Sequence, residues 1–227
     1  MCGRYTLRSR GSAKFYGVPA SELPFLVPRY NIAPSQDVPV ILERDAEREL
    51  ALFQWGLIPS WSKEPKGFIN ARAETLEGKP SFNESFVKRR CLIPADGFYE
   101  WKRNGNRKQP YFFQMKDEAP FAFAGIWDEW RRPGVSITSC PIITTTPNEL
   151  LSTIHDRMPV MLNTEAQEKW LRFDAVPSEL KDLLVPFPGS EMKSFPVSSQ
   201  VNHPQNDEAR LVEPIDIRPE QTTGMLF

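Results

Sequence analysis

The chain has 227 residues, of which 40% are hydrophobic and 25% charged, and a formal net charge of −1. This balance is ordinary for a globular protein and argues against disorder. The near-zero charge excludes a bulk field that attracts nucleic acid, so a DNA or RNA partner requires a local basic cleft. No apolar run approaches the ~18 residues that a membrane helix needs, and we expect no membrane partner.

The cysteine and histidine content argues against a metal site. Cys2, Cys91 and Cys140 have no C-x-x-C spacing, and only His155 and His203 could complete a ligand set. We therefore expect no metal, no cofactor and a reducing, cytoplasmic environment. Cys91 and Cys140 are then most simply buried as small apolar residues.

Strand-like runs dominate the chain. Its 22 prolines favour many short elements joined by fixed turns. The dipeptide Asn104-Gly105 predicts a tight hairpin between two of the runs. In chain order the runs cover residues 38–43, 49–56, 91–102, 110–116, 121–130 and 135–145.

Predicted helices are short and few. Thr146 as N-cap, with Glu149 closing a capping box, predicts one helix, and Thr164 with Gln167 predicts another. A third is expected over 81–90. The predicted fold class is α+β, with a single domain over residues 1–227. Its core is a largely antiparallel β-sheet, barrel-like or bifurcated, flanked by a few short helices, and its last ~10 residues could form a tail.

Cys2 directly follows the initiator methionine. No apolar run precedes it, so the start of the chain does not resemble a targeting segment. Loss of Met1 would place an α-amine with a reference pKa of about 7.7–8.0 and a thiol with one of about 8.5 on the same residue. Such a pair can attack an acyl carbon or condense with an aldehyde. Taken alone, a small apolar residue at a frayed terminus is the simpler interpretation.

Three further stretches carry polar residues in unusual settings. Asn70, Arg72 and Glu74 recur at every second position, which places them on one face if the stretch is a strand. Glu100 ends a predicted strand between two aromatic residues, where the pKa of a carboxyl can rise. An exposed glutamate on an edge strand is the plain alternative. His155 ends a predicted helix, where a histidine often only complements the helix dipole.

Taken together, six stretches resemble the SOS-response-associated peptidase (SRAP) family, in the family's order and from Met1 to about Pro214. They read MCGR, RYNIAPSQ, WGLIPSW, INARAET, RCLIPADGFYEW and IHDRMPVML. The resemblance implies that the protein binds single-stranded DNA and links covalently to abasic sites. It also implies that Met1 removes itself, after which the amine and thiol of Cys2 condense with the ring-opened sugar aldehyde to a thiazolidine.

The resemblance carries site residues with it. Positions that match the family's catalytic residues are Cys2, Asn70, Glu100 and His155. Expected DNA-binding residues are Arg4, Asn31, Pro34, Trp61, Arg72, Trp101, Arg157 and Met158. The arginines would neutralise phosphates, and the two tryptophans offer faces on which unpaired bases can stack. His203 departs from the small polar residue expected there and is given no catalytic role.

Two other functions stay open at the level of sequence. The start MCG is also that of class II glutamine amidotransferases, which are N-terminal-nucleophile amidohydrolases. A non-catalytic single-stranded DNA-binding protein would use the same arginines and tryptophans. The favoured interpretation is a monomeric enzyme with autopeptidase and lyase-type chemistry. It would act on abasic sites in single-stranded DNA in the cytoplasm, associated with the nucleoid when bound.

Overall fold

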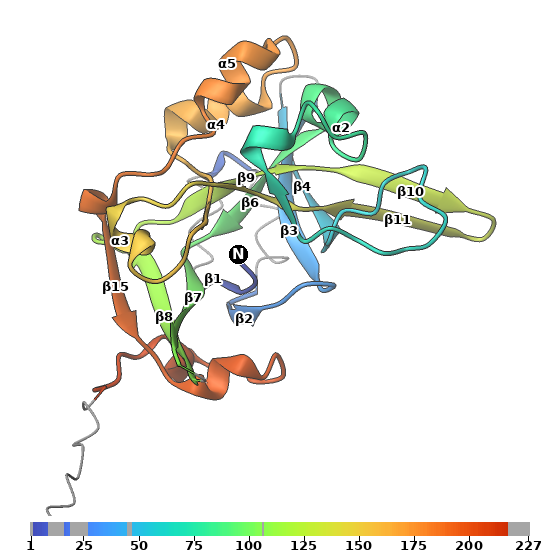
Figure 1. Cartoon of the computed structure of the whole chain (residues 1–227). Helices are drawn as coiled ribbons and strands as arrows, with labels where there is room; N and C mark the ends of the chain where they lie inside the picture. The colour runs from blue at the N-terminus through green and yellow to red at the C-terminus, as the bar shows by residue number, and fades with distance from the viewer. Residues whose placement is uncertain (1, 9–15, 19–26, 45–46, 106, 218–227) are drawn as a thin grey trace, which may run out of the picture.

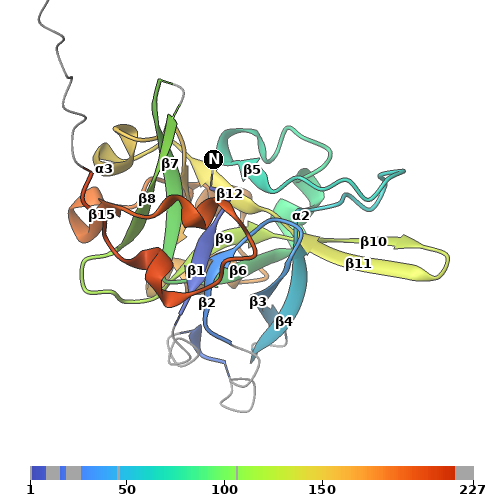
Figure 2. The ribbon, with the colours of Figure 1, turned by 90° about the horizontal axis from the view of Figure 1, so that it is seen from below.

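The computed structural model describes residues 2–8, 16–18, 27–44, 47–105 and 107–217. Met1 and the predicted C-terminal tail lie outside these residues. Within the described part, two β-sheets curl around a shared core, and short helices cover their margins (Figures 1 and 2). The α+β prediction with a largely antiparallel core is confirmed.

The first sheet carries the start of the chain. Every neighbouring pair in it is antiparallel. Its order is β15 (Met192–Pro196), β8 (Arg107–Met115), β7 (Gly97–Asn104), β1 (Tyr5–Leu7) and β2 (Arg29–Ile32). The predicted hairpin joins β7 to β8, where Asn104 pairs with Arg107 and Gly105 takes a positive φ of 57°.

The second sheet is larger. Its order is β10 (Asp128–Arg132), β11 (Val135–Cys140), β4 (Glu47–Trp55), β3 (Asp37–Arg44), β6 (Arg90–Ala95), β9 (Phe121–Ile126), β12 (Ile142–Thr145) and β13 (Met158–Pro159). In addition, β14 (Met161–Leu162) pairs with β9, and β5 (Asn70–Arg72) pairs with β12. Two pairings are parallel, β11 with β4 and β12 with β5. The β10–β11 hairpin projects from the body of the molecule (Figure 1).

Aromatic side chains join the two sheets. The ring of Tyr5 on β1 meets Trp55 of β4 edge to face at 5.4 Å and Phe123 of β9 at 5.7 Å. Phe98 on β7 stacks on Phe113 at 5.1 Å and also reaches Phe123. All five rings are almost completely buried. Such pairs add about 0.5–1.5 kcal/mol each beyond the burial of their area. They therefore fix the position of β1 and the residues that precede it.

The helices are short, as expected, but their caps differ from the prediction. The helical segments are α2 (Asn83–Lys88), α3 (Glu149–Ser152), α4 (Thr164–Leu171), α5 (Pro177–Asp182), η2 (Ala73–Thr75), η3 (Gly189–Glu191), η4 (Ser199–Asn202) and η5 (Ala209–Val212). Asn148 caps α3 by accepting from the Leu151 N–H, and Asn163 caps α4 by accepting from the Ala166 N–H. The N-cap predictions at Thr146 and Thr164 are wrong, because the asparagine side chain makes the capping bond in each helix.

A segment near the C-terminal end folds over the first sheet. We call residues 197–214 the C-terminal strap, because a bridge between Val197 and Pro214 closes it into a loop. Its apolar residues Val201 and Leu211 pack on Tyr99 of β7 in a second buried cluster. The strap thus forms one wall above β7, beside the start of the chain (Figure 2).

Candidate active site

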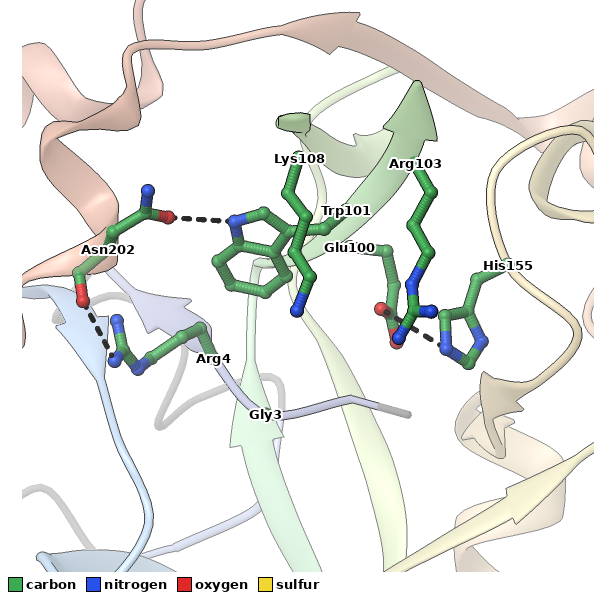
Figure 3. A pocket seen from close by; sticks show the side chains of 8 residues that line it. All are labelled: Gly3, Arg4, Glu100, Trp101, Arg103, Lys108, His155 and Asn202. Carbon is green, nitrogen blue, oxygen red and sulfur yellow. Dashed lines mark hydrogen bonds and ion pairs between the residues drawn. The ribbon is translucent and has the colours of Figure 1, made fainter. Parts of the chain in front are cut away.

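A pocket of about 490 Å³ opens where the start of the chain, the β7–β8 hairpin, the loop after α3 and the C-terminal strap meet (Figure 3). Its lining residues are Gly3, Arg4, Glu100, Trp101, Arg103, Lys108, His155 and Asn202. Four segments far apart in sequence therefore contribute to one cavity. Two of the residues predicted to be catalytic, Glu100 and His155, line it directly.

Cys2 lies buried beside this pocket. Its thiol is within 3.9 Å of the Arg4 carbonyl, and its own carbonyl accepts a hydrogen bond of 2.9 Å from Asn70 Nδ2. Burial raises the pKa of the Cys2 thiol far above its usual range, and the nearby Glu100 carboxylate raises it further. The Cys2 thiol is therefore protonated at neutral pH in the folded chain.

Asn70 reaches Cys2 from the opposite sheet. It begins β5, whose parallel pairing with β12 sets Asn70 opposite Ile142. Its Oδ1 is buried and has no hydrogen-bond partner among the described residues. A buried acceptor without a partner costs about 1–3 kcal/mol. Asn70 thus fixes the backbone of Cys2 with its amide group and keeps one acceptor open.

Glu100 is a buried carboxyl in the middle of β7. Its side chain is 2% exposed, so the alternative of an exposed glutamate on an edge strand is wrong. Burial raises the pKa of Glu100 to about 7, as its aromatic neighbours suggested. The group can therefore exchange a proton near neutral pH.

His155 faces Glu100 across the pocket. Its Nε2 lies 4.0 Å from Glu100 Oε2, while its Nδ1 accepts from the backbone N–H of Arg157 at 3.0 Å. Burial lowers the pKa of His155, and Asp156, whose Oδ1 lies 3.0 Å from Nδ1, pulls it upward. The Asp156 side chain is 88% exposed, so solvent screens its charge and burial prevails. The neutral ring then carries its proton on Nε2, toward Glu100.

The loop that carries His155 is tied to the end of β5. His155 lies beyond the end of α3, and its N–H donates to the Leu151 carbonyl at 2.9 Å. Arg157 forms a bidentate ion pair with Glu74, at 2.6 and 2.9 Å, which lowers the pKa of that carboxyl. Glu74 lies in η2 rather than in a strand, so the prediction that it shares one strand face with Asn70 and Arg72 is wrong.

Arg4 and Asn31 form part of the wall that holds the C-terminal strap. Arg4 donates to Asn31 Oδ1 at 3.2 Å and to the Val201 carbonyl at 2.5 Å. Asn31 is fully buried, and its Nδ2 donates to the carbonyls of Val201, His203 and Asn206. The Asn31 side chain has no surface to offer DNA, and its contacts position the strap and Arg4.

The remaining predicted DNA-binding residues lie in different settings. Trp101 is half-buried, and its Nε1 donates to Asn202 Oδ1 at 2.8 Å (Figure 3). Met158 is fully buried, Pro34 is half-buried and Arg72 is exposed.

Trp61 belongs to a separate hollow. Its side chain is 62% exposed and lines a pocket of about 560 Å³ together with Phe68. The loop that carries it is held by the β10–β11 hairpin, where Trp130 Nε1 donates to the Ser62 carbonyl at 2.8 Å. Trp61 therefore does not share the cavity of Glu100 and His155.

Three polar residues that line the pocket are not among the residues predicted from the sequence. Arg103 and Lys108 belong to the hairpin sequence KRNGNRK, whose Asn-Gly predicts a turn and whose run of cations is a signal for an anion site. Asn202 carries no signal in the sequence, because only the path of the strap brings it to Trp101.

Among the described residues, no group of three or more His, Cys, Asp or Glu side chains could hold a metal ion. In the same part of the chain, no helix has the length and apolar character needed to cross a membrane.

Comparison with known proteins places the chain in a family. Residues 1–204 match the family model described as SOS response associated peptidase (SRAP). The abasic site processing protein YoqW of Bacillus subtilis is 44% identical over 225 residues, which cover 94% of this chain and 99% of YoqW. The abasic site processing protein YedK of Escherichia coli is 31% identical and covers 95% of this chain and 100% of its own. A crystal structure of a protein from Bacteroides thetaiotaomicron superposes with a TM-score of 0.84 at 31% identity, covering 94% of this chain and 100% of that one.

Proposed function

Because the chain belongs to the SOS response associated peptidase family, we propose that it processes abasic sites in single-stranded DNA through a covalent bond to Cys2. The observation that carries the proposal is the 2.9 Å contact between Asn70 Nδ2 and the Cys2 carbonyl, beside a Glu100 whose pKa is about 7. A nucleophile, an amide that orients it and an acid thus lie close together.

The first proposed step prepares the nucleophile. Hydrolysis of the peptide bond between Met1 and Cys2 consumes one water, releases methionine and leaves a free α-amine on Cys2. Asn70 holds the Cys2 carbonyl and keeps the residue in place during this change. The new amine of Cys2 would then lie at the edge of the pocket, because the next residue, Gly3, lines it.

The second step opens the sugar. An abasic deoxyribose is a cyclic hemiacetal, and ring opening moves a proton from the C1 hydroxyl to the ring oxygen. Neutral His155 can carry this proton, since burial keeps the pKa of its ring low. The product is a free aldehyde within reach of the Cys2 amine.

The third step forms the adduct. The amine adds to the aldehyde carbon to give a carbinolamine, and Glu100 donates the proton with which water leaves, so an imine remains. The thiol of Cys2 then adds to the imine carbon, and its proton moves to the nitrogen. The sum is aldehyde plus cysteine giving thiazolidine plus one water. Glu100 suits this role because its pKa of about 7 leaves much of it protonated at neutral pH.

The test separates the two nucleophiles of Cys2. In Cys2→Ala the amine remains once Met1 is removed, so an imine forms but no ring closes. We expect no heat-stable adduct with an abasic single strand, and an adduct that borohydride traps, together with some strand cleavage by β-elimination. Cys140→Ala removes a buried thiol outside the pocket and serves as the matched control. Denaturing gels with and without borohydride give the readout.

The same experiment separates the other functions. A stable adduct from Cys2→Ala at the yield of the unaltered protein would contradict the thiazolidine. A non-catalytic DNA-binding protein would give no adduct in any variant, and an amidohydrolase would release ammonia from glutamine. Retention of Met1, shown by intact mass, in a chain that still forms the adduct would contradict the role of the amine.

A further inference from the structure

We propose that Arg103 and Lys108 form a phosphate-binding subsite at the reactive pocket, which takes a phosphodiester directly flanking the abasic nucleotide. The proposal rests on the proposed function and adds the group of the substrate that the pocket recognises besides the sugar.

The β7–β8 hairpin sets the two cations side by side. Arg103 pairs with Lys108 in the antiparallel register, so their side chains leave the sheet on the same face. Both line the pocket that Glu100 and His155 line. Figure 3 shows both side chains extending from the hairpin into the cavity, with the Arg103 guanidinium next to His155. The subsite is therefore adjacent to the groups proposed to act on the sugar.

The charge of this pair is not compensated within the described part of the chain. Among the described residues, the side chains of Arg103 and Lys108 have no hydrogen-bond or ion-pair partner. Arg4, the third cation of the pocket, is engaged with Asn31 and the Val201 carbonyl. Like charges directly opposite each other on a hairpin destabilise it. An anion bound between them would remove this cost.

The chemistry of the substrate identifies the anion. The ring-opened sugar is neutral, so the phosphodiesters on either side of it are the nearest negative charges. Arginine offers a planar fork of donors that suits phosphate oxygens, and lysine adds a mobile point charge. A phosphate held beside His155 would keep the C1 atom of the same nucleotide within the pocket.

The experiment removes charge either from the DNA or from the protein. Single-turnover adduct formation is measured with three abasic oligonucleotides: one unmodified, and two with a neutral methylphosphonate on the 5′ or the 3′ side of the lesion. We expect one neutral linkage to slow the unaltered protein about tenfold or more, as expected for loss of a charge-assisted contact. The double variant Arg103→Ala/Lys108→Ala should be slow with the unmodified strand and lose no further rate with that linkage.

Lys102→Ala is the matched control. Lys102 lies in the same hairpin, pairs with Gln109 and is exposed, but does not line the pocket. This variant should keep both the rate and the methylphosphonate effect of the unaltered protein. Thermal melting of all variants checks that they fold.

Two outcomes would overturn the subsite. One is an unaltered protein that tolerates both neutral linkages; the other is a double variant that still loses the full tenfold in rate.

Free 2-deoxyribose, which has no phosphate, tests the proposed function separately. Its thiazolidine adduct, detected by intact mass, should form in both the unaltered protein and the double variant. Failure of that adduct in both would contradict the covalent chemistry itself, whereas success without any phosphate effect would contradict the subsite alone.

Discussion

Glu100 is a carboxyl group that the fold holds away from water. It lies in β7 between the buried Tyr99 and the half-buried Trp101, and only 2% of its surface is exposed. Such a site disfavours the carboxylate and favours the protonated acid. The protein therefore has an acid available at neutral pH, and pays for it with stability whenever Glu100 is ionised.

Replacement of Glu100 by Gln should stabilise the protein at alkaline pH. The pKa of Glu100 lies at about 7 in the folded state against 4.5 ordinarily, so the folded state binds more protons between these values. The stabilisation is fully present below about pH 4.5 and is lost as the pH rises through about 7. Gln has no charge to bury, so Glu100→Gln should gain up to about 3 kcal/mol over the unaltered protein near pH 8 and nothing near pH 4.

Melting temperatures across this pH range give the measurement. The exposed Glu64, replaced by Gln, serves as control and should show no such pH dependence. A gain from Glu100→Gln that is equal at acid and alkaline pH would contradict a buried, titrating carboxyl. Adduct formation should at the same time become slower, because the acid proposed for the imine step is lost.

That the expected catalytic residues lie close together could be predicted from the sequence, while their roles stay predictions. The family pattern singled out Cys2, Asn70, Glu100 and His155, and the structure brings their segments together around one pocket. The sequence could not reveal that Asn31 is buried, because its contacts are backbone carbonyls of a strap far along the chain. Every residue has a backbone carbonyl, so the residue types along the strap do not show which carbonyls accept hydrogen bonds from Asn31.

At the scale of elements, the C-terminal strap completes the pocket. Asp207 accepts from the backbone N–H groups of Tyr30 and Asn31 and pairs with Arg29, while Asn31 donates back to the strap. β2 and the strap therefore hold each other through partly buried polar contacts. The strap in turn supplies Asn202 to Trp101.

Asn31→Ala should loosen the strap without unfolding the sheets. It leaves three carbonyls without the amide donor at 2.7–3.2 Å, a loss of about 1–3 kcal/mol in local stability. We expect faster amide exchange over residues 199–212 and slower adduct formation, because the wall that holds Arg4 and Asn202 becomes mobile. Hydrogen exchange followed by mass spectrometry measures the first effect.

The exposed Gln205 lies in the same strap and provides the control variant Gln205→Ala, which should change neither exchange nor activity. Unchanged exchange over 199–212 in Asn31→Ala would show that Asp207 and the apolar cluster alone hold the strap. The elements themselves are partly predictable: the runs form strands, but those over 91–102, 121–130 and 135–145 are each divided into two strands. Asn148 and Asn163, rather than the threonines, cap the helices. Neighbouring capping residues compete, and tertiary contacts decide between them.

On the scale of the whole molecule, the net charge of −1 hides an uneven distribution. Several arginines are neutralised internally, as in the pairs Arg8–Asp96 and Arg157–Glu74. The pocket has two cations, Arg103 and Lys108, without such partners in the part of the chain that the structure describes. The sequence predicts that a nucleic-acid partner would require a local basic cleft, but not which cations would lack an acidic partner. Ion-pair partners are set by contacts between residues that lie far apart in the sequence. The same holds for strand neighbours such as β11 and β4, which pair in parallel.

Arg72 and Arg157 should therefore contribute differently to the salt dependence of DNA binding. Arg72 is exposed, whereas the charge of Arg157 is shared with Glu74 at 2.6 Å. Arg72→Ala should weaken binding to an intact single strand and lower the slope of log affinity against log salt by about 0.7, the value for one phosphate. Glu74→Gln keeps the shape of the side chain but removes its charge, so Arg157 becomes available and binding should strengthen. Fluorescence anisotropy over a salt series, with Glu64→Gln as the control for loss of one acidic charge, decides the matter. Weaker binding by Glu74→Gln would mean that the pair serves chiefly to position the loop of His155.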